Sequence, residues 1–174
     1  MTTLKPPSQS GCRWVEECIE SCDAAAIYVE EQGVGATFLN PRRKQIRKIH
    51  YDGCYNKTPN ELKADYIVGM PDVLDVIVEL KGSDTNIKDA YSQVESTLEA
   101  WRVSPVRYRK IACLIVYGRI EGKKKLAGRV PRANSMKDSA ERQFLGANKA
   151  LLLVRESGSE QFRFNDFFRK NDAH

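Results

Sequence analysis

The sequence contains almost no histidine, with only His50 and His174 among 174 residues. A nucleophilic relay that depends on an imidazole, such as Ser-His-Asp or Cys-His, would therefore have to use His50. That residue lies in the basic stretch Arg47–Asp52, which reads as a strand, and a strand histidine more often has a structural than a catalytic role. Carboxylates and lysines are left as the side chains available for catalysis.

A long apolar run and a secretory leader are also lacking. No apolar stretch approaches the roughly 18–20 residues that a membrane-spanning helix needs, and the N-terminal residues MTTLKPPSQS are polar. The cysteines are odd in number and form neither a C-x-x-C pair nor, with histidine, a zinc site: Cys12, Cys18, Cys22, Cys54 and Cys113. We therefore expect a cytoplasmic protein with reduced thiols and no membrane partner.

No phosphate loop or dinucleotide fingerprint is present. Gly33-Val34-Gly35 is not followed by the Gly-Lys-Ser/Thr that a phosphate loop needs. The length suits one domain, and 41% hydrophobic residues suffice for a buried core. We expect a flexible arm over residues 1–11 and a single domain over residues 12–174. The net charge of +5 is compatible with a polyanionic partner but does not establish one.

The hydrophobic pattern predicts an α/β domain with a mixed sheet. Residues 14–22 are expected to form a short helix, because Trp14, Cys18 and Cys22 recur at every fourth position. Residues 24–31 are ambiguous between helix and strand, and residues 161–168 between an edge strand and a short helix. The segment 33–41 carries turn and strand signals. The other expected strands are 45–55, 64–68, 73–81, 111–117 and 150–155, and the other expected helices are 87–101 and 136–145.

Two adjacent expected strands carry the chemistry. Thirteen residues separate Asp65 from Glu79, which suits antiparallel neighbours and their turn. Glu79 and Lys81 share a face because side chains alternate along a strand. Two close carboxylates repel unless a cation lies between them, and Mg2+ is the hard cation that prefers oxygen ligands. We expect Mg2+ to take one oxygen each from Asp65 and Glu79, together with the Leu80 carbonyl, while Lys81 orients or deprotonates the attacking water.

Asp65 followed by Val76-Ile77-Val78-Glu79-Leu80-Lys81 resembles the PD-(D/E)XK nuclease superfamily, which includes restriction endonucleases and archaeal-type Holliday junction resolvases. The similarity covers residues 46–117, including the amphipathic helix with Gln93, which matches the glutamine that many members place near the metal. The resemblance implies a restriction-endonuclease-like three-layer fold, with a central mixed β-sheet flanked by helices. It also implies Mg2+-dependent hydrolysis, with Mn2+ as a substitute, and often a homodimer.

The sequence departs from the family pattern at two points. Residue 64 is alanine where the pattern has proline. The family's further carboxylate on the first helix has no clear match, so the number of metals stays open. The competing residues are Glu16, Glu17, Glu20, Glu30 and Glu31. Asp52 lies shortly before the Asp65 strand and is better explained as the start of a turn.

Two basic clusters could contact a phosphate backbone. The first consists of Arg42, Arg43, Lys44, Arg47 and Lys48, and the second of Lys123, Lys124 and Lys125. An aromatic also lies among cations in the stretch 107–110, where Tyr108 could stack on a base. The function expected from these features is a metal-dependent endonuclease acting on nucleic acid, most readily DNA. The alternative is a non-catalytic nucleic-acid-binding or assembly protein that retains the nuclease fold.

Overall fold

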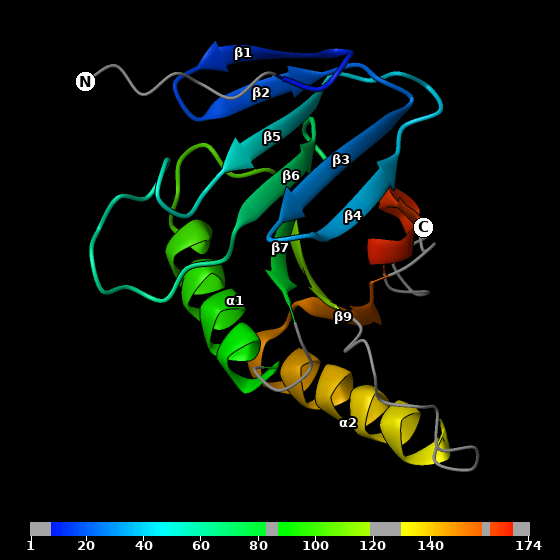
Figure 1. Ribbon diagram of the computed structural model, residues 1–174. Helices are drawn as coiled ribbons and strands as arrows, with labels where there is room; N and C mark the ends of the chain where they lie inside the picture. The colour runs from blue at the N-terminus through cyan, green and yellow to red at the C-terminus, as the bar shows by residue number, and fades with distance from the viewer. Residues whose placement is uncertain (1–7, 83–86, 119–129, 158–160, 169–174) are drawn as a thin grey trace.

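The computed structural model describes residues 8–82, 87–118, 130–157 and 161–168. The strands are β1 (Cys12–Glu16), β2 (Ile19–Cys22), β3 (Ala26–Glu31), β4 (Val34–Leu39), β5 (Ile46–His50), β6 (Tyr66–Met70), β7 (Leu74–Lys81), β8 (Lys110–Tyr117), β9 (Leu151–Glu156) and β10 (Gln161–Arg163). The helices are α1 (Ile87–Arg102) and α2 (Val130–Asn148), with a 3-10 turn η2 (Phe164–Phe167). Figure 1 shows α1 alongside the large sheet, and α2 beginning away from the sheet and reaching it beside β9.

The large sheet has seven strands in the order β1-β2-β5-β6-β7-β8-β9. In this order, β1, β2, β5 and β6 are each antiparallel to the next strand. Strands β7, β8 and β9 are parallel to one another. Helix α1 connects β7 to β8, which is the connection that parallel neighbours require. The predicted α/β class and mixed sheet are confirmed.

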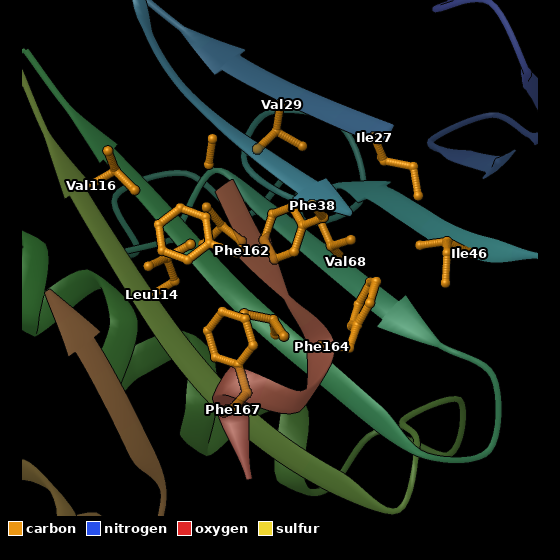
Figure 2. Packing of buried hydrophobic residues seen from close by; sticks show 14 of the residues in the cluster. Ile27, Val29, Phe38, Ile46, Val68, Leu114, Val116, Phe162, Phe164 and Phe167 are labelled. Atoms are coloured by element: carbon orange, nitrogen blue, oxygen red, sulfur yellow. The ribbon is translucent and has the colours of Figure 1, made fainter. Parts of the chain in front are cut away.

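A second sheet covers the other face of the large sheet. Strands β10, β4 and β3 form it, and Phe38 of β4 lies at its centre (Figure 2). Its ring centroid lies 5.9, 5.7 and 6.1 Å from those of Phe162, Phe164 and Phe167. Burying side chains of this size contributes about 1.5–3 kcal/mol each. The expected helical layer on this face is thus replaced, in the part of the chain described, by a small sheet and the turn η2.

The N-terminal prediction of a helix over residues 14–22 was wrong. Strands β1 and β2 form an antiparallel hairpin there, with Cys12 opposite Cys22 and Trp14 opposite Glu20. The spacing of Trp14, Cys18 and Cys22 fits a helix, but four is also an even number, so the same residues can share one face of extended strands. Of the expected flexible arm, residues 1–7 lie outside the described ranges, and the Gln9 side chain bonds the backbone of Ala26 and Tyr28.

The cysteines form two disulfides, Cys12–Cys22 and Cys18–Cys54. The second joins residues 36 apart in sequence and ties the hairpin to the loop after β5. Closing a loop of that length stabilises a fold by about 3–4 kcal/mol in the chain-entropy treatment. The prediction of reduced thiols was therefore wrong for these four cysteines. The cytoplasmic location that was inferred from it loses its support. Within the described residues, no helix is both long and apolar enough to cross a membrane.

Candidate metal and catalytic site

Asp65 and Glu79 lie opposite each other at one end of the β6–β7 pair. Tyr66 pairs with Val78, so the next step outward along the antiparallel register places Asp65 across from Glu79. Asp65 Oδ2 accepts a hydrogen bond of 2.8 Å from the Leu80 backbone N–H. The expected approach of these two carboxylates on neighbouring strands is therefore present in the structure.

Glu79 and Lys81 extend from the face of β7 that α1 covers. Ile77, two residues earlier, belongs to the hydrophobic cluster that packs against this helix. Glu79 has a side chain only 1% exposed, and its Oε1 lies 2.8 Å from Lys81 Nζ. Lys81 is 20% exposed, so its ammonium contacts both the buried Glu79 carboxylate and solvent.

Helix α1 holds the segment that leads into Asp65. Gln93 Nε2 donates to the Lys63 carbonyl at 3.0 Å, and one turn later Thr97 Oγ1 accepts the Ala64 N–H at 2.8 Å. These two side chains share a helix face because they are four residues apart. The two residues that precede Asp65 are therefore fixed against the helix.

Two buried oxygens in this region have no hydrogen-bond partner among the described residues: Glu79 Oε2 and Gln93 Oε1. Both are acceptors, and an unmatched buried acceptor costs roughly 1–3 kcal/mol. A bound cation or water would satisfy them. Gln93 thus lies beside the segment that leads into Asp65, and its role near a metal stays a prediction.

Burial raises the pKa of both carboxyl groups. The pKa of Asp65 rises to about 6, chiefly through loss of solvation and despite the hydrogen bond from Leu80. The pKa of Glu79 rises to about 8, through burial first and the Asp65 charge second, and these outweigh the opposing effect of Lys81. A carboxylate pair that resists ionisation in this way gains most from a cation that compensates its charge.

Further acidic groups surround the pair. The Glu31 and Asp52 charges both raise the pKa of Asp65, with Glu31 the stronger of the two. Asp52 is exposed and lies 3.4 Å from Lys63 Nζ in the loop after β5, which fits its expected role in a turn. Of the glutamates that compete for a further metal-binding role, Glu31 is therefore the one whose charge acts most strongly on the site.

The donor set fits a hard divalent cation. Asp65 and Glu79 supply carboxylate oxygens, and the Leu80 carbonyl of the predicted ligand set follows Glu79 directly. One other group of potential ligands occurs in the described residues, namely Cys12, Glu20 and Cys22. Its two sulfurs form a disulfide, and Glu20 pairs with Lys48 at 3.1 Å. The disulfide and the ion pair with Lys48 thus commit this group to other partners.

The residues of the first predicted basic cluster have different environments. Arg42, Arg43 and Lys44 are exposed in the turn before β5. Lys48 is buried against Glu20, and Arg47 donates to Asp75 at 3.0 Å. Those two residues are therefore structural cations, a correction to their expected role in phosphate contact. Lys123, Lys124 and Lys125 lie outside the described residues.

The exposed part of that cluster lies away from the carboxylates. In the β5–β6 register Arg47 pairs with Gly69 and His50 with Tyr66, so Asp65 adjoins the end of β5 that is farther from Lys44. Tyr108 is also engaged, since the Arg47 guanidinium lies 4.0 Å from its ring centroid. A base that stacked on Tyr108 would have to compete with this cation.

His50 has a structural environment. Its Nε2 lies 2.9 Å from Glu20 Oε1, and its ring centroid lies 4.8 Å from that of Trp14 and 5.1 Å from that of Tyr66. His50 pairs with Tyr66, which packs against the cluster on the small-sheet side. His50 is thus directed away from the face that carries Glu79 and Lys81.

Thr97 was not recognised from sequence, although it lies one helical turn after Gln93. We expect Thr97→Val to lower the free energy of unfolding by about 1–3 kcal/mol, because the buried Ala64 N–H loses its acceptor. Chemical denaturation should show this loss. The matched control Ser92→Val replaces an exposed hydroxyl on the same helix. Equal stability of the two variants would mean that Thr97 does not support the Asp65 segment.

No family model matches the chain, and searches of curated proteins and solved structures gave no match. The resemblance to PD-(D/E)XK nucleases therefore rests on the residues of the site and their arrangement.

Proposed function

We propose that this protein is a metal-dependent nuclease that hydrolyses phosphodiester bonds in nucleic acid, with DNA as the preferred substrate. Asp65, Glu79 and the Leu80 carbonyl would hold Mg2+ or Mn2+. Lys81 would act on the attacking water and Gln93 would position the site. The core arrangement from β5 to β8 is the part of the fold on which a restriction-endonuclease-like assignment rests.

The observation that carries the proposal is the buried Glu79 carboxylate. One of its oxygens contacts Lys81 and the other has no hydrogen-bond partner in the described part of the chain. A buried carboxylate oxygen without a hydrogen bond is able to accept one from water or to bind a cation. Facing Asp65 across the sheet with a pKa of about 8, Glu79 is arranged to share a cation.

The chain's own groups account for the remaining chemistry. Lys81 contacts Glu79 and is partly exposed, so its ammonium can also donate to a phosphate oxygen or orient a water. Hydrolysis joins that water's oxygen to phosphorus and breaks the opposite P–O bond. The proton that the water loses passes to solvent, and the leaving oxygen takes up a proton from solvent in turn. A bound divalent cation supplies charge stabilisation on the phosphate.

The topology also suits a substrate site. The carboxyl ends of β7 and β8 meet where the Gly118 N–H donates to the Lys81 carbonyl at 2.6 Å. Ligands of open α/β sheets commonly bind at the carboxyl ends of parallel strands. Arg42, Arg43 and Lys44 lie at the far end of β5 from Asp65, so they would contact the phosphate backbone at a distance from the bond that is cut. Assembly as a homodimer stays a prediction.

The decisive comparison is between wild type and Lys81→Ala, each on plasmid, single-stranded and branched DNA. We expect cleavage with Mg2+ or Mn2+, none with chelator, and a rate about 10²-fold lower in the variant. The control is Lys57→Ala, which removes a 62% exposed lysine from the surface. Equal residual cleavage by all three proteins would identify a contaminant. Binding without cleavage under every condition would favour the non-catalytic alternative.

A further inference from the structure

A basic pocket lies at the end of the sheet opposite the carboxylate site. Its volume is about 590 Å³, within the range of small-ligand sites. Five cationic side chains line it, and none of its lining residues among the described ones is acidic: Arg102, Arg107, Arg109, Lys110 and Lys149. The remaining lining is apolar, with Leu74, Ile111 and Leu151 at the starts of three parallel strands and Phe167 from η2.

The pocket is separate from the carboxylate site. Leu74 pairs with Lys110 at the pocket end of β7 and β8, whereas Lys81 pairs with Tyr117 at the other end. Seven residue steps along a strand correspond to ~23 Å. One bound phosphate group could not contact both places.

Helix capping accounts for two of the cations. Arg102 donates to the Asn148 carbonyl at the end of α2, and Arg107 Nε donates to the Arg102 carbonyl at the end of α1. These contacts offset the negative ends of both helices, which would otherwise repel an anion. A guanidinium has five donors, so each arginine retains further N–H groups.

Two further cations have no such explanation. Arg109 and Lys149 are exposed, and the described residues give their side chains no ion pair or hydrogen bond. Beside them, Lys110 Nζ lies 5.1 Å from the ring centroid of Phe168. Arg109 and Lys149 thus add two exposed positive charges to a concave site that other cations already line, and a bound anion would relieve their mutual repulsion.

We propose that the basic pocket binds a phosphate group. Several arginines favour phosphate, because the planar guanidinium matches its oxygens in a bidentate manner. Five cations also suit a multiply charged anion better than a single carboxylate. The phosphate can come from a free polyphosphate or from a nucleic-acid backbone, and neither source requires that the carboxylate site be catalytic.

The test measures binding in chelator, so that no cleavage is involved. Pyrophosphate is titrated by calorimetry, and a fluorescent single-stranded oligonucleotide of about 20 nucleotides by anisotropy. The variant is Arg109→Gln/Lys149→Gln, which removes two exposed charges. The matched control is Lys57→Gln/Lys88→Gln, which removes two exposed charges elsewhere. Thermal melting checks that all three proteins are folded.

We expect the pocket variant to weaken binding at least about tenfold and the control to leave it unchanged. For the oligonucleotide, the slope of log K against log salt should become shallower by about 1.4, because each phosphate contact on a single strand contributes about 0.7. Loss with pyrophosphate alone identifies a free phosphate as the source, and loss with the oligonucleotide alone identifies the backbone. Equal binding by the pocket variant and wild type in both titrations, or no binding of either probe, overturns the inference. Either result leaves the Lys81 cleavage test unaffected.

Discussion

Replacing Glu79 by glutamine is expected to abolish metal-dependent cleavage and also to stabilise the metal-free protein near pH 8. The amide keeps the size of the side chain and an acceptor oxygen but removes the negative charge. A site that loses one of two carboxylate ligands should lose its cation, and we expect the cleavage rate to fall at least about 10³-fold. The gain in stability follows from the raised pKa of the native carboxyl.

The direction of the pH effect can be derived from that pKa. Glu79 titrates near 4.5 when unperturbed and near 8 in the folded chain, so between these values the folded state binds more protons than the unfolded state. The free energy of unfolding must therefore fall as pH rises from about 4.5 to about 8. Asp65 adds a smaller fall between about 3.8 and about 6. Glu79→Gln removes the larger contribution.

Thermal denaturation in chelator between pH 5 and 9 measures this difference. The wild-type curve should decline across the range, and the Glu79→Gln curve should decline less and lie above it near pH 8. Mg2+ should raise the melting temperature of wild type increasingly with pH, because it binds the deprotonated carboxylates, and should not raise that of the variant. Glu99→Gln, an exposed change on α1, is the control. Parallel pH curves for wild type and Glu79→Gln would contradict a raised Glu79 pKa.

The position of Asp65 opposite Glu79 could be predicted from sequence, because the alternation of side chains along a strand and the spacing of a hairpin are local properties. Residues 74–81 are almost continuously apolar apart from Asp75, Glu79 and Lys81, which identifies a buried strand. The stripe that includes Ala90, Val94 and Leu98 gave α1 within one residue at its C-terminal end. Both elements bury continuous faces, so periodicity and packing favour the same structure.

Predictions were weaker where distant residues decide the outcome. Arg47 and Lys48 read as a surface cluster, but their partners Asp75 and Glu20 are 28 residues away in sequence. The disulfides were missed because an odd number of cysteines without a paired motif favoured the prediction of thiols. The second sheet was missed as a layer because pairing between β10 and β4 joins segments more than a hundred residues apart. None of these contacts has a local signal.

Asp75→Ala is expected to destabilise the fold more than Thr97→Val does. Asp75 has no exposed surface and accepts hydrogen bonds from Arg47 Nη2 at 3.0 Å, Trp101 Nε1 at 2.8 Å and the Tyr108 N–H at 2.7 Å. Alanine leaves all three donors without this acceptor. Removing one partner of a buried ion pair costs about 3–5 kcal/mol, which corresponds to a fall in melting temperature of roughly 6–20 °C for a chain of this size.

The control Asp23→Ala removes an exposed carboxylate and should change the melting temperature little. A second substitution separates the lost charge partner from the cavity. Adding Arg47→Met to Asp75→Ala removes the uncompensated cation and should recover part of the lost stability. Further destabilisation by Arg47→Met in that background would mean that Arg47 acts chiefly through its contacts with Tyr108 and Val106 rather than through Asp75.

Asp75→Ala also tests whether the stability of this fold and its catalysis depend on separate residues. Asp75 lies on the same face of β7 as Glu79 but four residues earlier, a separation of ~13 Å along a strand. Asp75 joins β5, β7, α1 and the loop before β8. At the other end, Leu80 bonds the Asp65 side chain, and Gln93 and Thr97 bond the two residues before it. Cleavage per folded molecule, measured at a temperature well below the lowered melting point, should therefore be unchanged in Asp75→Ala. A proportionate loss of activity in fully folded Asp75→Ala would show that the two ends of β7 are coupled.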